Sequence, residues 1–328
     1  MEKEQMDALR AQVREQMDAH NFRMRQVSNA SGVAYSTLSA WLNDTYTGDN
    51  LATAEKMTRW VESMSARERV RAATPIVPGF IMTRTAKRFM AIMESAQYEV
   101  DMGLVSGNAG VGKTMAIEAY AAQNNNVWVV TADPTMTSPS AVLDELMYVV
   151  GCHERGGRKI RILIRRLIGT QGLIVVDEAQ HLTTRAIEQL RTIHDVAKIG
   201  LVLFGNLPLN EKIEGLGRTS EYAQLFSRIG LRRNVKQPLQ SDMCPLLKEW
   251  GLKDQGVIDH AKAIGLREGG LRSMTKVLKN AVKMAQANGR DQVSMDDLER
   301  SFKEHMTGEF PKLRGLPDTR GQQAVAAE

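Results

Sequence analysis

The chain has 328 residues, of which 43% are hydrophobic and 25% are charged, and this length suggests two or three domains. The hydrophobic content is sufficient for a folded core. The formal charge of +5 is too small an excess to identify an acidic partner, so charge alone assigns no class of ligand.

Residues 1–65 are predicted to form an all-α domain of four short helices. A helix, a turn at Gly32 and a second helix fit the helix-turn-helix motif. Tyr35, Ser36 and Ser39 would then face the major groove of DNA. The four positions after Tyr35 hold no Arg, Lys, Gln or Asn, so bidentate reading of bases is not expected. A weakly specific DNA contact, the docking of a protein, and a helical domain without DNA contact all remain open.

The remaining domain boundaries follow from composition. The fourth N-terminal helix is expected to bury Leu51. Residues 66–80 combine charged residues with two prolines and are predicted to be a linker. An α/β core is then predicted over residues 81–240 and a bundle of about four helices over residues 241–314. The tail, residues 315–328, is rich in Gly, Gln and Ala and is expected to be disordered.

The clearest motif is GNAGVGKT, which fits the phosphate-loop pattern G-x-x-x-x-G-K-[ST]. An apolar strand precedes it and a helical segment follows it, and backbone N–H groups in such a turn bind phosphate oxygens. The pattern predicts that Lys113 contacts the β- and γ-phosphates of ATP and that the Thr114 hydroxyl binds Mg²⁺. The predicted phosphate-binding residues are Gly107, Asn108, Ala109, Gly110, Val111, Gly112, Lys113 and Thr114.

A basic segment follows the phosphate loop. Residues 155–168, RGGRKIRILIRRLI, contain six basic residues and no acidic one. Their apolar residues recur at i, i+3, i+4 and i+7, which predicts an amphipathic helix with its apolar side on the core. We expect the opposite side to bind nucleic-acid phosphates, since a merely solvated helix face, the alternative, would normally include Glu or Asp as well. The basic residues in question are Arg158, Lys159, Arg161, Arg165 and Arg166.

Two further strands end in polar residues. The run GLIVVDEAQHL predicts a buried parallel strand that ends at Asp177 and Glu178. Asp177 would contribute to the Mg²⁺ shell, and Glu178 could act as general base toward the attacking water. The strand IGLVLFGN ends at Asn206, which is suited to orienting that water. Read alone, the acidic pair could cap a helix, and Asn206 could be an ordinary turn residue.

Other features of the sequence indicate in which cellular compartment the protein is found. Cys152 and Cys244 lie far apart in the sequence, so reduced thiols are expected rather than a disulfide framework. The histidines show no metal-ligand spacing, and Mg²⁺ is the only metal expected. No apolar run approaches membrane-spanning length, and the charged N-terminus is unlike a signal peptide, so a cytoplasmic protein without membrane contact is expected.

The motifs in this order resemble the AAA+ ATPase family: a P-loop core with a parallel sheet, followed by a helical lid. More closely, the chain resembles the transposition protein B family of Mu-like transposable phages. The stretches that show this are SGVAYSTLSAWLNDTYTGDN, GNAGVGKT, NNNVWVV, TQGLIVVDEAQHL, IGLVLFGN and LFSRI. The resemblance implies an ATP-dependent protein that polymerises on double-stranded DNA, delivers this target to a transposase and stimulates strand transfer in a bacterial or phage-infected cell.

The resemblance also implies roles for two arginines. Arg228 in LFSRIG matches the arginine finger that an AAA+ protein inserts into a neighbour's nucleotide site, and Arg218 is a rival for that role. Arg272 in GGLRSMTK matches the arginine that senses the γ-phosphate. A helicase loader or replication initiator would share every core motif, and a DNA-binding regulator that uses nucleotide only as a switch also remains open.

Overall fold

A computed structural model of the chain describes residues 3–72, 75, 77–154, 158–209 and 229–313. It divides into two compact units, Met1–Ile76 and Val77–Glu328, and each is described by itself. Within the described ranges, no helix is long and apolar enough to cross a membrane. The predicted C-terminal tail lies outside these ranges.

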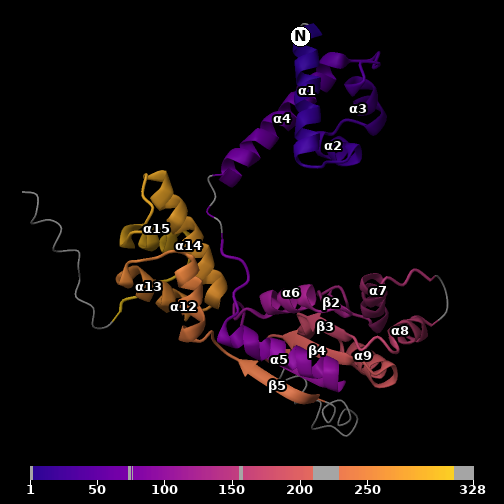
Figure 1. The fold of residues 1–328 in the computed structure, drawn as a ribbon, viewed down its shortest axis with the longest axis vertical. Helices are drawn as coiled ribbons and strands as arrows, with labels where there is room; N and C mark the ends of the chain where they lie inside the picture. Colours follow the sequence, from indigo (N-terminus) through magenta and orange to yellow (C-terminus); the bar gives the residue numbers. More distant parts are fainter. Residues whose placement is uncertain (1–2, 73–74, 76, 155–157, 210–228, 314–328) are drawn as a thin grey trace, which may run out of the picture. The chain divides into compact units, whose positions relative to one another are not determined.

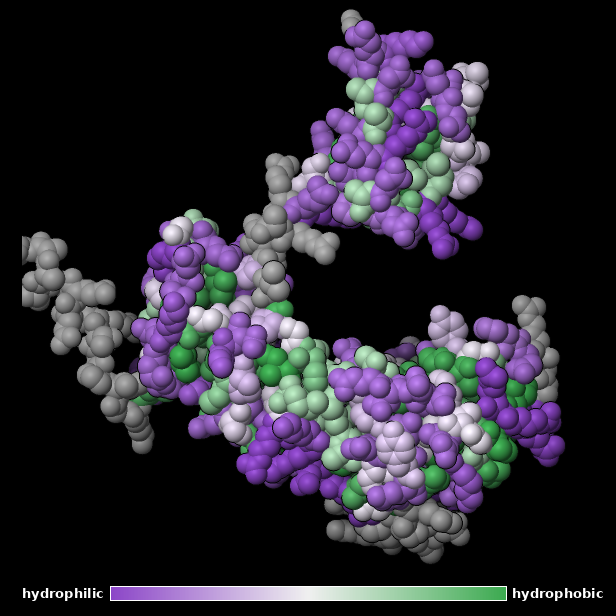
Figure 2. Space-filling view, viewed as in Figure 1, coloured by the Kyte–Doolittle hydropathy of each residue, from purple (hydrophilic) through white to green (hydrophobic). Residues whose placement is uncertain are grey.

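The first unit consists of four helices: α1 (Lys3–Ala19), α2 (Met24–Ser31), α3 (Tyr35–Leu42) and α4 (Asn50–Ala72) (Figure 1). Helix α2 ends at Gly32 in the left-handed region (φ +67°), which a glycine adopts without steric cost. The turn leads directly into α3 and completes the predicted helix-turn-helix. Trp41 lies fully buried at the centre of this unit's core, and in Figure 2 the visible surface of the unit is predominantly hydrophilic.

Two expectations for this region are wrong. Leu51 is 55% exposed, because it lies in the first turn of α4 beyond the packed part of that helix. The segment 66–80 is not a linker throughout, since α4 continues to Ala72 and the second unit begins at Val77. Charged residues are good helix formers, and the two prolines that suggested a break come only after the helix has ended.

The second unit is built on a parallel sheet of five strands in the order β2-β3-β4-β1-β5. The central strands β3, β4 and β1 are buried along their whole length, as their continuous apolar sequences predict, whereas the edge strands β2 and β5 are partly exposed. This confirms the predicted α/β fold. The strands are β1 (Met102–Gly107), β2 (Val127–Thr131), β3 (Leu173–Asp177), β4 (Gly200–Gly205) and β5 (Ile229–Val235).

Helices cover both faces of the sheet (Figure 1). Alternate residues of β3 point to opposite faces: Leu173 and Val175 pack with α5 and α6, whereas Ile174 and Val176 pack with α7, α8 and α9. The resulting three layers hold the carboxyl ends of the strands at one edge. The helices are α5 (Arg84–Glu99), α6 (Lys113–Gln123), α7 (Pro139–Val150), α8 (Lys159–Leu167) and α9 (Thr184–Ala197).

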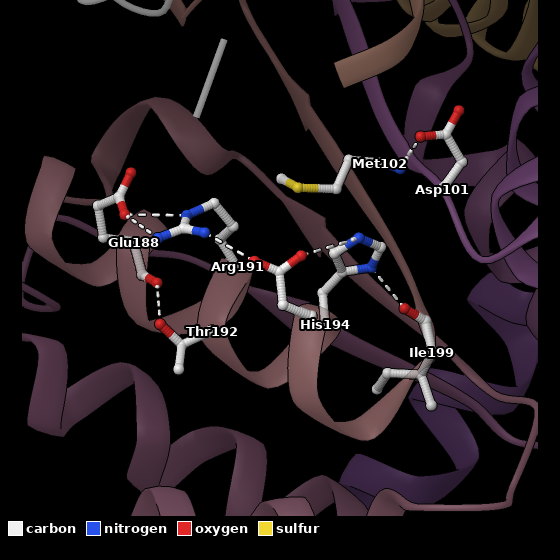
Figure 3. A network of polar contacts seen from close by, with 8 residues as sticks. Asp101, Met102, Glu188, Arg191, Thr192, His194 and Ile199 are labelled. Carbon is white, nitrogen blue, oxygen red and sulfur yellow. Dashed lines mark hydrogen bonds and ion pairs between the residues drawn. The ribbon is translucent and has the colours of Figure 1, made fainter. Parts of the chain in front are cut away.

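A polar network fixes the opposite edge of the sheet, where α9 ends and β4 begins (Figure 3). Arg191 bridges Glu188 and Asp195 within α9 at 2.9 and 2.7 Å. The buried His194 contacts the carbonyl oxygen of Ile199 through Nδ1 at 2.6 Å. Of these contacts, the one between His194 and Ile199 crosses the α9–β4 turn and ties the end of the helix to the residue before the strand.

Four helices form the lid, around their own hydrophobic core: α12 (Gln240–Glu249), α13 (Gln255–Gly265), α14 (Gly270–Ala287) and α15 (Met295–His305). The lid is attached to α5 by the fully buried Asp242, which accepts hydrogen bonds from the backbone N–H of Thr85 at 3.0 Å and from its hydroxyl. A buried carboxylate is stable only when its oxygens are paired, and this contact therefore ties the lid to the start of the core.

Candidate nucleotide and nucleic-acid sites

The phosphate loop joins the buried strand β1 to helix α6. Gly110 and Gly112 have φ angles of +80° and +92°, a region that side-chain-bearing residues rarely adopt. The backbone N–H groups of residues 109–112 have no acceptor among the residues that the structure describes. Unpaired N–H groups at a helix N-terminus are suited to phosphate oxygens, so the loop fits the group that its sequence predicts.

Two of the loop glycines are also required by close backbone contacts. A Cβ atom at Gly107 would lie 2.6 Å from the carbonyl oxygen of Val235, and a Cβ atom at Gly110 would lie 1.9 Å from that of Gly269. The carbonyl oxygen of Gly110 also accepts a 2.9 Å hydrogen bond from the N–H of Leu271 in the first turn of α14. The phosphate loop is therefore in direct contact with the lid.

Lys113 is buried beneath this loop and points back into it. Its Nζ donates to the carbonyl oxygens of Gly107 at 2.8 Å and Asn108 at 3.1 Å. Burial lowers the pKa of the Lys113 amine, the carboxylates of Glu178 and Asp177 raise it, and the charge of Arg272 lowers it further. The charged residues that influence the pKa of this amine come from two other predicted motifs, the acidic strand end and the start of the lid helix α14.

The two predicted Mg²⁺ ligands meet at the ends of α6 and β3. The Thr114 hydroxyl donates to a carboxylate oxygen of Asp177 at 2.7 Å, and Asp177 is 3% exposed. A hydroxyl and a carboxylate are oxygen ligands of the kind that Mg²⁺ prefers, and in these sites the metal also binds phosphate oxygens. The donor set therefore fits the predicted ion.

The candidate general base Glu178 follows Asp177 in the left-handed region, with φ +53°. This conformation is unusual for a residue with a side chain and often marks a functional position. The side-chain amide of Gln180 donates to one carboxylate oxygen of Glu178 and accepts a 3.1 Å hydrogen bond from the backbone N–H of Asn206. The structure thus brings Glu178 and Asn206 together through a residue that the motifs did not identify.

Arg272 lies in the first turn of α14, exposed, on the lid helix that contacts the phosphate loop. A cavity of about 320 Å³ opens between the loop and the lid. Its lining residues are Asn108, Ala109, Lys236, Gln237, Pro238, Arg267, Glu268, Gly269 and Gly270. Arg228 and its rival Arg218 lie outside the described residues.

The predicted basic helix exists as α8, preceded by Arg158. Its apolar side chains Leu163 and Leu167 are fully buried against α7 and α9, whereas the arginines at 158, 161, 165 and 166 are exposed. Lys159 differs from them, because its Nζ pairs with Asp144 of α7 at 2.6 Å and with the Ser140 hydroxyl at 2.7 Å. The charge of Lys159 is therefore partly neutralised. The α8 ridge, the basic surface that remains available to an anion, is formed by the four exposed arginines.

The helix-turn-helix presents its predicted contact residues unevenly. Tyr35 is 56% exposed and Ser36 is exposed, but Ser39 is only partly accessible.

Lid helix α14 carries a basic row that the sequence motifs did not identify. Lys276, Lys279 and Lys283 are exposed and follow Arg272 at spacings of four, seven and eleven residues. This helical periodicity is visible in the sequence. For Gln180, the sequence gives only a weak indication of a role, namely its position close to the acidic pair Asp177 and Glu178.

Family models match two parts of the chain. A model described as an AAA domain matches residues 97–213, and one described as Mu B transposition protein, C terminal, matches residues 227–305. The chain is 34% identical over 299 residues to the ATP-dependent target DNA activator B of Escherichia phage Mu, covering 90% of this chain and 94% of that protein. It is 36% identical over 258 residues to the Mu-like prophage FluMu DNA transposition protein B of Haemophilus influenzae, covering 76% and 88%.

Solved structures with a similar fold include the ORC2 protein of Aeropyrum pernix, with a TM-score of 0.52 and 18% identity over 72% of this chain and 71% of that one. Cdc6p of Pyrobaculum aerophilum gives a TM-score of 0.54 at 15% identity, over 72% and 71%. At these identities the likeness concerns the fold alone.

Proposed function

Because the chain belongs to the Mu B transposition protein family, we propose that it is an ATP-dependent DNA-binding ATPase that assembles on target DNA and delivers it to a transposase, stimulating strand transfer. The observation that supports the ATPase most directly is the convergence of three strand ends on one site. The phosphate loop follows β1, the Thr114–Asp177 pair joins α6 to β3, and Glu178 approaches Asn206 at the end of β4.

The proposed chemistry assigns one task to each residue. The loop N–H groups and Lys113 bind the phosphates, and Thr114 and Asp177 would hold Mg²⁺, which stabilises phosphate charge when bound. The oxygen of a water molecule attacks the γ-phosphorus, the bond to the β-phosphate oxygen breaks, and the Glu178 carboxylate accepts the water's proton. Arg272, next to the loop, would contact the γ-phosphate from the lid.

For DNA we propose that the arginines of the α8 ridge contact phosphates. Phosphate contacts hold a duplex in place but read little sequence, so binding would be weakly sequence-specific and salt-dependent. The helix-turn-helix would add at most a weak contact or dock a protein, because its first turn presents Tyr35 and Ser36 rather than base-reading side chains.

The proposed link between nucleotide and DNA is assembly. An arginine supplied by a neighbouring subunit, Arg228 or its rival Arg218, would complete each nucleotide site, so that ATP binding favours a helical array and hydrolysis releases subunits. A ligand that binds only the assembled state stabilises that state by mass action.

Electron microscopy of the protein with duplex DNA and a non-hydrolysable ATP analogue tests this proposal. We expect helical filaments on DNA, dependent on the nucleotide, and ATPase activity that rises with a partner transposase. Isolated closed rings, with an ATPase stimulated by a helicase instead, would contradict the proposal and favour a loader.

A further inference from the structure

Gln180 lies between the two residues on which hydrolysis is proposed to depend. It sits in the short 3-10 turn Ala179–His181 after β3. Its Nε2 donates to Oε2 of Glu178, and its Oε1 accepts from the backbone N–H of Asn206 at 3.1 Å. The amide therefore bridges the ends of β3 and β4.

The orientation of this amide is set by chemistry. A backbone N–H can only donate, so the end of the Gln180 side chain that faces Asn206 must be the carbonyl oxygen. The NH₂ end must then face Glu178, whose ionised carboxylate can only accept. Both partners demand the same orientation, and flipping the amide would place two donors together at one end and two acceptors at the other.

Asn206 itself has a further unusual feature. Its side-chain Oδ1 is buried and has no hydrogen-bond partner among the described groups. A buried acceptor without a partner is costly, and it favours any rearrangement that supplies a donor. Because the backbone N–H of the same residue is bonded to Gln180, a displacement of Asn206 would move the amide and with it the carboxylate of Glu178.

We propose that Gln180 is a positioning residue for ATP hydrolysis, which orients the Glu178 carboxylate and couples it to the position of Asn206. This inference rests on the proposed ATPase function. The bond to Gln180 occupies one carboxylate oxygen and leaves the other to accept the proton of the attacking water. Without the bond, the carboxylate rotates freely, and a base displaced by about 1 Å can lose on the order of 100-fold in rate.

Two variants separate positioning from packing. Gln180→Met keeps the length of the side chain and removes both hydrogen bonds. We expect kcat for ATP to fall by about tenfold or more, while KM and the affinity for a fluorescent ATP analogue stay within about twofold. Gln286→Met, an equal change at an exposed position on α14, is the control and should match wild type. A wild-type kcat for Gln180→Met overturns the proposal.

Gln180→Glu provides a readout that a packing role would not affect. Its carboxylate keeps an acceptor for the Asn206 N–H but places a negative charge against Glu178. The Glu178 carboxylate therefore loses its N–H donor and faces a second carboxylate instead, although the side chain at position 180 keeps the size and shape of glutamine. We expect kcat of Gln180→Glu to fall at least as far as that of Gln180→Met, whereas a side chain that served only packing would tolerate this isosteric change.

The outcomes distinguish this inference from the function on which it rests. If wild type does not hydrolyse ATP, or if Glu178→Gln hydrolyses it at the wild-type rate, the proposed chemistry itself fails. If Glu178→Gln is inactive but Gln180→Glu hydrolyses ATP at the wild-type rate, only the role of Gln180 is refuted. Equal melting temperatures of the variants establish that the losses do not reflect unfolding.

Discussion

The Thr114 hydroxyl and the Asp177 carboxylate form a 2.7 Å hydrogen bond, although 63 positions separate them in the chain. The bond places the start of the helix after the phosphate loop against the end of β3. Both side chains present oxygen atoms, the ligand type that Mg²⁺ prefers, so a metal ion bound with nucleotide would replace an existing contact rather than gather distant groups. The site is thus preorganised, and substitutions in it are expected to change chemistry rather than fold.

Lys113→Ala should abolish nucleotide binding and with it ATP-dependent DNA binding, because it removes the positive charge that is held within the phosphate loop by the carbonyl oxygens of Gly107 and Asn108. Glu178→Gln should keep nucleotide affinity but stop hydrolysis, so that the protein remains on DNA. Nucleotide affinity, ATP turnover and DNA dissociation measured for both variants check this. Wild-type turnover by Glu178→Gln would show that the base is a different residue.

Gly110→Ala should separate the lid from the phosphate loop. Its Cβ would lie 1.9 Å from the Gly269 carbonyl oxygen, and its φ is positive. We expect ATP affinity to fall by about tenfold or more, equivalent to about 1.4 kcal/mol. Gly151→Ala is the matched control, since it has a similar φ of +76° but nothing within 4 Å of the added Cβ. It should cost about 1–2 kcal/mol of stability and leave ATP affinity unchanged; equal affinity losses would contradict the role of the Gly110–Gly269 contact.

Replacing Arg161 and Arg165 together by alanine should weaken ATP-dependent binding to all DNA sequences about equally. Each lost phosphate contact should flatten the dependence of log K on log salt by roughly one unit. Affinity measured from low to high salt checks both effects. The control is the double variant Lys276→Ala and Lys279→Ala, which removes the same charge from α14. It tests whether the loss of DNA affinity is a general electrostatic effect.

Deleting residues 1–76 is the complementary experiment for DNA binding, since these form a separate compact unit. Residues 1–76 hold ten Lys and Arg against ten Asp and Glu and so carry no net positive charge, and we expect most ATP-dependent DNA affinity to survive their removal. If the truncation destroys binding while the double arginine variant matches wild type, the α8 ridge is only a solvated face and the N-terminal unit binds the DNA.

Arg228→Ala should bind ATP nearly normally but lose hydrolysis and assembly, if this arginine acts on the nucleotide of a neighbour. Mixing Arg228→Ala with Lys113→Ala subunits forms interfaces that combine an intact nucleotide pocket with an intact finger. Activity should therefore return in the mixture, measured as ATP turnover across mixing ratios. Absence of recovery at every ratio would count against Arg228 and leave Arg218 as the candidate.

The lid should lose stability at low pH through Asp297. Burial raises the pKa of this carboxyl group, but hydrogen bonds from the Arg290 guanidinium and from the backbone and hydroxyl of Ser294 lower it more, to about 2. A folded-state pKa below the unfolded value of about 3.9 means that the stabilisation is complete above about pH 4 and is lost as the pH falls toward 2. Its size is about 2 kcal/mol.

Hydrogen exchange of the α15 amides measures this effect. Asp297→Asn should reduce their protection at pH 6, and the difference from wild type should shrink toward pH 3. Asp296→Asn, at a neighbouring side chain that is 77% exposed, should behave as wild type. A difference for Asp297→Asn that does not depend on pH would show that the carboxylate's charge contributes nothing.

Local sequence was enough for the phosphate loop, the three buried strands and the amphipathic α8. Each is encoded within a few consecutive residues: glycines that allow positive φ, unbroken apolar runs, or apolar residues at helical spacing. The linker prediction failed because proline and charge are weak boundary signals, and α4 continues to Ala72. Leu51 was misplaced because a helical pattern does not reveal where packing against the other helices begins.

Contacts between distant segments were decided only by tertiary structure. The pairing of Lys159 with Asp144, the approach of Gly110 to Gly269, and the bridge from Gln180 to Asn206 each join elements whose separation in space no local pattern specifies. The order of strands in the sheet places β3 beside β4, and this adjacency sets Gln180 between the two strand ends. Sequence thus determined which groups could perform the chemistry, whereas the packing of the sheet determined which of them meet, because hydrogen bonds and steric contacts act only over a few ångströms.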